Sequence, residues 1–407
     1  MNARNYPVFT VTPKAERSLR AGHPWVYGEE ITGIEGAYQN ADIVDVVSNK
    51  GRYLGSGWVN DHSKIRVRLI SRNANDTFDE AFFCRRVRYA LDYRRTVMGE
   101  DFSCCRLIFG EADQFPGLTV DRFDSVLVVQ TLSLGMEARK EMVFRALVDI
   151  LREYGEKVDA IYERNDVAIR ALEGMEQYKG FYAMEGLRTD LDGHIEICEN
   201  GIYYDVDYIN GQKTGFFLDQ KYNRQAVARL AKGRRVLDCF THTGAFALNA
   251  AKAGAQRVTA VDVSQSALSL AAENGRRNGL TNLDYTCADV FDLLTQMAQD
   301  GKCPYDFIIL DPPAFTKSSA TAKNAYRGYK EINLKAMQLL PRGGYLATCS
   351  CSHFMTDEMF RRMLREAAAD AGVSLRQIEA RQQAPDHPIL MEVPETDYLK
   401  FYLLQVV

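Results

Sequence analysis

The segment GYLATCSCSH, residues 344–353, places two cysteines two positions apart at the end of an apolar run. Such thiols can be small apolar fillers of a buried strand, ligands of a metal ion, or nucleophiles. Side chains alternate along a strand, so Cys349 and Cys351 point to the same side, with Cys351 nearer the end. We assign Cys349 to the core. We predict that Cys351, at the rim, acts as a nucleophilic thiolate in an electropositive, partly exposed setting.

The other cysteines give no sign of a metal site. The chain holds nine cysteines in 407 residues, with no CxxC pair and no Cys/His cluster at zinc spacing, so no metal is expected. The odd count and the absence of an apolar leader favour reduced thiols in the cytoplasm. No apolar run is long enough to predict a membrane-spanning helix, and the net charge of −4 gives no overall basic signature for nucleic acid.

A carboxylate followed by two prolines and an aromatic residue forms the second reactive group. In ILDPPAF, Asp311 ends an apolar strand and is followed by Pro312, Pro313 and Phe315. Proline fixes its own φ angle and restrains the residue before it, so this exit from the strand is rigid. Such a loop suits a flat acceptor base, and in a doubly wound sheet its strand neighbours that of Cys351. A plain turn is the alternative use of the two prolines.

Three more acids end successive strands: Asp238, Asp262 and Asp289. The loop CFTHTGAF after the first strand contains Gly244, which lets backbone approach a ligand closely. An acid after the second strand can accept hydrogen bonds from ribose hydroxyls, and one after the third can accept from an amino group. Asp238 or Asp289 could instead cap the following helix. Together the three acids predict a nucleoside cofactor held without a phosphate cradle, since neither GxGxxG nor a P-loop is present.

The elements that position these residues alternate between strand and helix. Apolar runs between residues 191 and 407 predict strands at RVLDCF, RVTAVD, LDYTCAD, YDFIILD, GYLATCSC and YLKFYLLQV. Helical patterns such as SQSALSLAAENGRRNG and YKEINLKAMQLL lie between them. This alternation predicts an α/β fold with a parallel sheet whose strands are buried on both faces. Ligands of such sheets bind beyond the carboxyl ends of the strands, where the acids and Cys351 lie.

The rest of the chain predicts two smaller domains. Residues 1–72 carry short alternating strands broken by glycines, with ten Lys/Arg against seven Asp/Glu, and predict a β-rich module. Arg66 and Arg68 share one face of a strand there, which is either a solvated face or a phosphate-binding one. Residues 73–190 begin with an arginine-rich helix and continue with strands and a second helix, which predicts a central α/β domain. The third domain spans residues 191–407.

The first strand of that third domain and its loop resemble a known cofactor motif. The pattern D-x-F-x-x-x-G-x-F is similar to motif I of class I S-adenosylmethionine-dependent methyltransferases, and is read here as Asp238, Phe240, Gly244 and Phe246. By this resemblance, Asp262 holds the ribose, Asp289 lies beside the adenine, and the glycine loop runs along the methionine moiety. The DPPAF segment resembles the (D/N)PP(Y/F) signature of amino-group methyltransferases, in which the acid and a proline carbonyl bind an exocyclic amine.

Nearly the whole chain resembles the RlmI family of 23S ribosomal RNA (cytosine-5)-methyltransferases. The resemblance rests on GHPWVYGEEI, GQKTGFFLDQKYNR, LDCFTHTGAF, ILDPPAF and TCSCS. It implies an RNA-binding PUA-like domain, with Arg66 and Arg68 toward ribosomal RNA, and a central α/β domain. It also implies a Rossmann-like methyltransferase domain with a seven-stranded, mostly parallel sheet, in which Gln220 and Arg224 flank the site of S-adenosylmethionine.

The same resemblance assigns roles at the reaction centre. Cys351 adds to carbon-6 of a cytosine, so that carbon-5 can take a methyl group and then lose its proton. Asp311 positions the base together with Pro312, Pro313 and Phe315. Many RNA 5-methylcytosine enzymes carry a second cysteine in the fourth-strand motif, whereas DPPAF has none. We therefore also expect Asp311 to assist removal of the proton.

Two other functions remain open from the sequence alone. An amino methyltransferase acting on adenine or guanine would use the DPPAF segment and would not need the thiol of Cys351. An RNA-binding assembly factor with a vestigial cofactor fold would not bind S-adenosylmethionine, and Asp262→Ala would change nothing. The sequence also leaves open a homodimer, the target nucleotide, and whether free RNA or a ribosomal particle is the substrate.

Overall fold

The computed structural model describes residues 4–301, 303–316 and 321–407, which form two compact units. Unit 1 contains the chain up to Ile197 together with Val206–Leu218 and Pro385–Thr396. Unit 2 contains Cys198–Asp205, Asp219–Ala384 and Asp397–Val407. The chain therefore returns to unit 1 twice after first leaving it. A short two-stranded sheet, formed by β12 His194–Glu199 and β13 Ile202–Asp207, lies where the chain first passes from one unit to the other.

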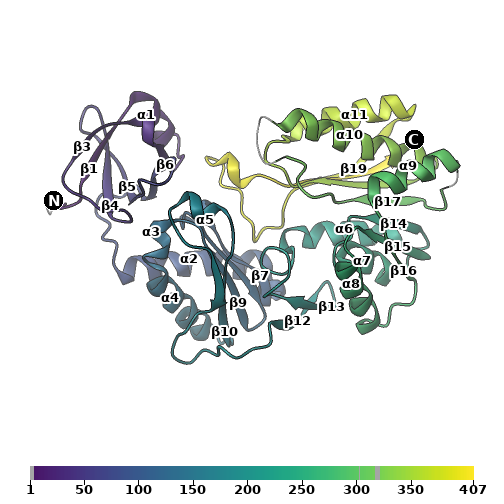
Figure 1. Ribbon diagram of the computed structural model, residues 1–407, viewed down its shortest axis with the longest axis horizontal. Helices are drawn as coiled ribbons and strands as arrows, with labels where there is room; N and C mark the ends of the chain where they lie inside the picture. Colours follow the sequence, from purple (N-terminus) through teal and green to yellow (C-terminus); the bar gives the residue numbers. More distant parts are fainter. Residues whose placement is uncertain (1–3, 302, 317–320) are drawn as a thin grey trace. The chain divides into compact units, whose positions relative to one another are not determined.

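The N-terminal part of unit 1 is a six-stranded sheet with the strand order β2-β6-β5-β4-β1-β3 (Figure 1). Its strands are β1 Val8–Val11, β2 Trp25–Tyr27, β3 Ile31–Glu35, β4 Ile43–Ser48, β5 Tyr53–Val59 and β6 Ile65–Ser71. Helix α1, Pro13–Arg20, begins after Thr12, whose hydroxyl accepts a hydrogen bond from the Ala15 amide. Position 57 inside β5 requires glycine, because a Cβ there would stand 2.0 Å from the carbonyl oxygen of Arg68 on β6. The β-rich character expected of this region is confirmed.

The rest of unit 1 is built on a five-stranded sheet with the order β11-β10-β9-β8-β7. Its strands are β7 Cys104–Phe109, β8 Leu118–Phe123, β9 Val126–Thr131, β10 Ala160–Asn165 and β11 Tyr178–Phe181. Its helices are α2 Glu80–Met98, α3 Leu134–Glu137, α4 Lys140–Glu153 and α5 Ile169–Leu172. The two long helices, α2 and α4, contact one another and each buries an apolar stripe. Helix α4 is also the crossover that lets β9 and β10 pair in parallel.

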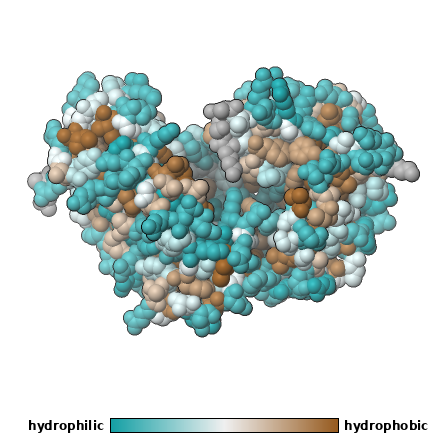
Figure 2. Space-filling model, viewed as in Figure 1, coloured by the Kyte–Doolittle hydropathy of each residue, from teal (hydrophilic) through white to brown (hydrophobic). Residues whose placement is uncertain are grey.

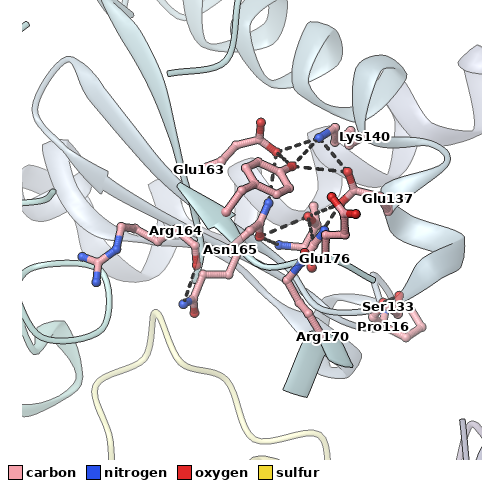
Figure 3. A network of polar contacts seen from close by, with 12 residues as sticks. Pro116, Ser133, Glu137, Lys140, Glu163, Arg164, Asn165, Arg170 and Glu176 are labelled. Carbon is pink, nitrogen blue, oxygen red and sulfur yellow. Dashed lines mark hydrogen bonds and ion pairs between the residues drawn. The ribbon is translucent and has the colours of Figure 1, made fainter. Parts of the chain in front are cut away.

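A polar network ties this second sheet to its helices (Figure 3). Glu137, at the end of α3, accepts hydrogen bonds from Thr131 and Arg170 at 2.6 and 2.9 Å. The ammonium of Lys140 lies 2.7 Å from Glu137 and 2.8 Å from Glu163. Burial alone would raise the pKa of Glu137, but the hydrogen bonds from its partners outweigh burial and lower this pKa to about 2. The carboxylate of Glu137 is therefore strongly stabilised by its partners.

Replacing Glu137 with glutamine is expected to lower the free energy of unfolding near neutral pH by about 2 kcal/mol, because two cations lose a shared partner. The lowered pKa means that this stability is present above the ordinary value of 4.5 and is lost as the pH falls toward about 2. Urea unfolding at neutral and acidic pH measures the difference. Glu141→Gln is the matched control, since Glu141 is largely exposed and pairs with Arg145 at the surface. Equal effects of the two substitutions would contradict the prediction.

Unit 2 is built on a seven-stranded sheet with the order β16-β15-β14-β17-β18-β20-β19 (Figure 1). Its strands are β14 Arg235–Cys239, β15 Arg257–Asp262, β16 Leu283–Cys287, β17 Phe307–Leu310, β18 Tyr345–Ser350, β19 Leu375–Arg381 and β20 Lys400–Val406. The strands from β16 to β18 pair in parallel, whereas β20 is antiparallel to β18 and β19. The expected mostly parallel sheet is confirmed, and β17 and β18, which lead to Asp311 and Cys351, are neighbours.

Helices cover both faces of this sheet (Figure 1). They are α6 Lys221–Ala231, α7 Ala245–Lys252, α8 Gln265–Arg277, α9 Val290–Asp300, α10 Ala322–Leu339 and α11 Asp357–Ala371. Helices α6 and α7 pack on one face, in a core that includes Val236, Ile309 and Cys349. Helices α9, α10 and α11 pack on the other face, in a core that includes Leu237 and Leu310. Alternate residues of each strand face the two cores, which is why these strands read as unbroken apolar runs.

The surface of the molecule is mainly polar on the face shown in Figure 2, where small apolar areas are separated by hydrophilic side chains. Across the three described stretches, no helix combines the length and the apolar composition that crossing a bilayer requires. All nine cysteines lie in the described part of the chain, and none of them forms a disulfide.

Candidate active site

The acids predicted from the sequence gather at the carboxyl end of the sheet of unit 2. Asp238, near the end of β14, is fully buried and accepts a hydrogen bond of 2.5 Å from Thr241. Burial, with the negative charges of Asp311 and Asp262, raises the pKa of Asp238 to about 7. Asp238 is thus close enough to each of the other two acids to be repelled by them. This part of the site therefore favours a positively charged ligand.

The loop after β14 has an uncommon backbone. Phe240, His242 and Gly244 all have positive φ angles, of 63°, 51° and 85°. Glycine adopts this region without strain, whereas the two larger residues must be held there by the surrounding structure. At Gly244, a Cβ would also stand 2.6 Å from Leu248 and 3.0 Å from Ala271. The positive φ and the close approach of Ala271 in α8 therefore both favour glycine here, and the second is a reason that the sequence did not reveal.

Asp262 ends β15, and the backbone fixes its carboxylate. Its two oxygens accept hydrogen bonds from the amides of His242 and Ser264, at 2.8 and 2.9 Å. Each oxygen keeps a second lone pair with which it can accept a hydrogen bond from a ligand hydroxyl. The next residue, Val263, is 72% exposed and offers an apolar surface for a flat ring. Sequence reasoning missed Val263, although an apolar residue directly after an acid at the end of a strand could have indicated a surface for a flat ring.

Asp289 takes the capping role that the sequence had left open. It precedes α9, and its Oδ1 accepts hydrogen bonds from the amides of Phe291 and Asp292, at 2.8 and 3.2 Å. The residue is exposed. Its second carboxylate oxygen takes no part in this cap, and the predicted contact with an amino group of adenine stays a prediction.

Asp311 directly follows β17 and is half-buried beside the start of α6. The side-chain amide of Gln220 donates a hydrogen bond of 3.0 Å to Asp311 Oδ1, and Asn223 donates one of 2.6 Å to Gln220. Burial and the charge of Asp219 raise the pKa of Asp311 to about 6. A carboxyl group with this pKa can exchange a proton near neutral pH. Gln220, predicted to flank the cofactor, is thus placed directly against Asp311.

The two cysteines of TCSCS differ in their surroundings. Cys349 is fully buried in the core beneath α6 and α7. Burial and the charge of Asp311 raise the pKa of Cys349 well above its usual range, which disfavours the thiolate. Cys351 follows β18 and is half-buried. Strands β17 and β18 pair in parallel, so Asp311 and Cys351, which directly follow them, lie at the same edge of the sheet. The charges of both also act on the hydroxyl of Tyr329.

The remaining residues of the DPPAF loop differ in exposure. Pro312 is buried and Pro313 is exposed. The ring centroid of Phe315 lies 4.6 Å from that of Tyr329 in α10, so Phe315 is partly used in packing. Pro313 therefore offers the most open surface of this loop for a substrate base.

The arginines predicted to bind ligands all take part in ion pairs. Arg224, in α6, is buried and lies 2.7 Å from Glu199. In unit 1, Arg68 is buried and pairs with Glu173 at 2.8 Å, whereas Arg66 is paired but 27% exposed. Arg68 could reach a phosphate only by leaving a buried partner without its charge, which is costly. The structure therefore places Arg68 in a buried ion pair within unit 1, and its contact with RNA stays a prediction.

Comparison with known proteins bears directly on this site. A family model described as S-adenosylmethionine-dependent methyltransferase matches residues 106–403. This chain belongs to that family. A PUA-like domain model matches residues 9–72 of the methyltransferase, so the expected N-terminal domain is confirmed.

Curated relatives cover nearly the whole methyltransferase. The ribosomal RNA large subunit methyltransferase I of Pseudoalteromonas translucida is 41% identical over 394 residues, which cover 96% of this chain and 97% of the relative. The protein of the same name from Shewanella denitrificans is 42% identical over 399 residues, 97% of this chain and 98% of the relative. The resemblance to the RlmI family is confirmed.

A solved structure shares the fold. A protein from Streptococcus mutans, assigned as a S-adenosylmethionine-dependent methyltransferase, matches with a TM-score of 0.81 and 22% sequence identity. The match covers 98% of this chain and 100% of that chain. The fold of this chain therefore recurs at low sequence identity.

S-adenosylmethionine is the cofactor of this methyltransferase, and the residues of unit 2 fit it. The cofactor carries a positive sulfonium and an ammonium group, which suit the acids Asp238, Asp262 and Asp311. Asp262 would offer a carboxylate to the ribose, and the exposed Val263 would offer an apolar surface to the adenine. When bound, the cofactor supplies an electrophilic methyl group.

Asp262→Ala is expected to weaken the binding of S-adenosylmethionine by about 100-fold, since two hydrogen bonds from ribose hydroxyls to a charged group would be lost. Isothermal titration with the full-length protein measures the change. Asp284→Ala is the matched control, because Asp284 lies on β16 and pairs with Arg257 at the surface. A variant at Asp262 that keeps the original affinity would remove this acid from the cofactor site.

Proposed function

We propose that this methyltransferase methylates carbon-5 of one cytosine in the ribosomal RNA of the large subunit, through a covalent bond between Cys351 and the base. The curated relatives, called ribosomal RNA large subunit methyltransferase I, support the choice of RNA. The observation that carries the choice of carbon-5 is the half-buried thiol of Cys351 at the end of β18, in the same site as Asp311. An amino methyltransferase would have no use for that thiol.

The proposed reaction uses two side chains of this chain. The thiolate of Cys351 adds to carbon-6, and the electron pair of the C5–C6 double bond makes carbon-5 nucleophilic. Carbon-5 takes the methyl group of S-adenosylmethionine. The bond between that methyl group and the sulfonium breaks, and its electron pair stays on the sulfur of the cofactor. Asp311 then accepts the proton of carbon-5, the double bond re-forms, and Cys351 leaves as a thiolate. With a pKa of about 6, Asp311 is mostly ionised at neutral pH and ready to accept that proton.

The partner and place of the reaction follow from this proposal. Ribosomal RNA is the substrate, and Arg66 of the PUA-like domain stays a candidate contact because its side chain is partly exposed. The reaction takes place in the cytoplasm, together with ribosome assembly. The comparisons give no support to the homodimer that the sequence left open, and it is not part of the proposal.

Bisulfite sequencing of ribosomal RNA from cells with and without the gene tests the proposal. One cytosine of the large-subunit RNA should be protected in the parent cells and converted in cells without the gene. Protection should return with a plasmid copy of the gene and not with a copy that carries Cys351→Ser. Unchanged protection of every cytosine, with a lost methyl group on an adenine or guanine, would support the amino methyltransferase instead.

A further inference from the structure

A buried lysine lies beside the reactive thiol and has no role in the reaction above. Lys400 is the first residue of β20 and is directly opposite Ser350, the last residue of β18. It is only 5% exposed. Its ammonium donates hydrogen bonds to the carbonyl oxygens of Ser352 and Tyr398, at 2.6 and 2.8 Å. The positive charge is therefore held against the residue that immediately follows Cys351.

Neutral carbonyl groups, not carboxylates, hold this ammonium. Among the described residues, none places a carboxylate in hydrogen-bond contact with Lys400. A buried cation that is held by neutral dipoles keeps much of its field, because little water screens it and no carboxylate bonds to it directly, although Asp397 and Asp357 act on it at longer range. Lys400 pairs with Ser350 and donates to Ser352, so its field acts at the end of β18, on the two sides of Cys351.

We propose that the ammonium of Lys400 stabilises the thiolate of Cys351 and so prepares this thiol to attack the base. The inference rests on the proposed function, in which Cys351 is the nucleophile. A nearby positive charge favours the thiolate, which is the reactive form of a cysteine. Lys400 is a positioning residue, since it acts through Cys351 and not on the substrate.

The charges that face Lys400 come from three elements. Cys351 follows β18, Asp357 begins α11, and Asp397 precedes β20. Burial lowers the pKa of Lys400 to about 8, although these three groups act to raise it. Lys400 is therefore mostly protonated at neutral pH. Because the thiolate of Cys351 favours the charged form of Lys400, the ammonium favours the thiolate by the same coupling.

The rate at which iodoacetamide alkylates Cys351 across the pH range from weakly acidic to weakly basic tests this proposal in the full-length protein. Mass spectrometry of the peptide that contains Cys351 gives the rate for this thiol alone. Lys400→Gln removes the charge but keeps hydrogen-bond donors, whereas Lys400→Arg keeps the charge. We expect Lys400→Gln to slow alkylation at neutral pH by about tenfold and to shift the pH profile upward by about one unit. Lys400→Arg should restore most of the rate.

Internal controls come from the same digest. Cys198 and Cys287 are both exposed and lie in unit 2, so their alkylation rates should be the same in all variants. Thermal unfolding of each variant shows whether the fold is kept. The methyl-transfer assay adds a second readout: Lys400→Gln should lower kcat by about tenfold without changing the affinity for S-adenosylmethionine.

Two results would overturn the inference. If Cys351 in Lys400→Gln reacts as fast as in the parent protein, the charge of Lys400 does not act on the thiol. If Lys400→Gln and Lys400→Arg slow the reaction equally, Lys400 only holds the chain in place. Alkylation needs neither RNA nor cofactor, so both results are separate from a failure of the proposed function. That failure would show itself as full activity in Cys351→Ser.

Discussion

Cys351→Ser should lower the rate of methyl transfer to ribosomal RNA by at least about 10⁴-fold, because the variant loses the nucleophile of the reaction. A serine hydroxyl is almost wholly protonated at neutral pH and adds to carbon-6 far more slowly than a thiolate. The exchange alters a single atom at a half-buried position, so the fold should be kept. Transfer of labelled methyl groups measures the rate. Titration with S-adenosylmethionine should give an unchanged affinity.

Cys349→Ser is the matched control for this experiment. Cys349 lies two residues away, fully buried beneath α6 and α7. The thiol of Cys349 is hydrogen-bonded to Asp311. A serine hydroxyl can make the same bond, so activity should stay within about tenfold of the parent protein. RNA with 5-fluorocytidine at the target should remain attached to the parent protein and to Cys349→Ser, since fluorine cannot leave carbon-5 as a proton does. An active Cys351→Ser that traps no RNA would favour amino-group methylation.

The sheet of unit 2 was largely readable from the sequence, because its strands are apolar and end in charged residues. Strands β14, β15, β17 and β18 are buried on both faces, so their runs stand out whatever their partners are. Strand β19 was not predicted. It contains Arg376, Gln377 and Glu379, is mostly exposed or half-buried, and lies at the edge of the sheet. This segment is a strand because it pairs with β20, and its own sequence shows no sign of that pairing.

Buried charges are the part of the site that the sequence concealed. Lysine and arginine are ordinarily placed at the surface, because burying an unpaired charge is costly. Arg68 and Arg94 are buried because Glu173 and Asp113 meet them there, more than ten residues away in the chain. Lys400 can be buried because two carbonyl groups accept hydrogen bonds from its ammonium. Such partners become visible only when the fold brings them together, so the sequence did not show that Arg68 is buried and gave no sign of a role for Lys400.

The division of the chain into two compact units could not be predicted from the sequence either. The expected division at residues 72 and 190 follows changes in composition, and it stays a prediction. The segment Pro385–Thr396 joins unit 1 although the residues on both sides belong to unit 2. Within it, Asp386 is buried and accepts a hydrogen bond of 2.8 Å from the amide of Arg106. A single hydrogen bond between a carboxylate and an amide far away in the chain leaves no pattern in the sequence, so this return of the chain to unit 1 could not be predicted.

Asp311→Asn should lower kcat by about 10²- to 10³-fold, the usual loss when a proton acceptor is removed. Asparagine has the same size and can still accept the hydrogen bond from Gln220, but it cannot take up a proton. In the parent protein, kcat should rise with pH through about 6, since burial raises the pKa of Asp311 to this value and only the ionised carboxylate accepts a proton. That rise should be absent in the variant. A pH series of single-turnover rates measures both effects.

Asp306→Asn is the control for Asp311→Asn, because Asp306 and Asp311 flank the two ends of β17. Asp306 is half-buried and accepts a hydrogen bond of 3.0 Å from the amide of Arg235, at the end of the sheet away from the site. Its replacement should keep both the rate and the rise with pH.

If Asp311 removes the proton of carbon-5, Asp311→Asn should accumulate RNA bound to Cys351 even with ordinary cytosine, because release is blocked after methylation. If Asp311 only orients the base, addition of the thiolate slows as well and no bound RNA accumulates. Retention of the rise near pH 6 in Asp311→Asn would transfer the role of proton acceptor to another group.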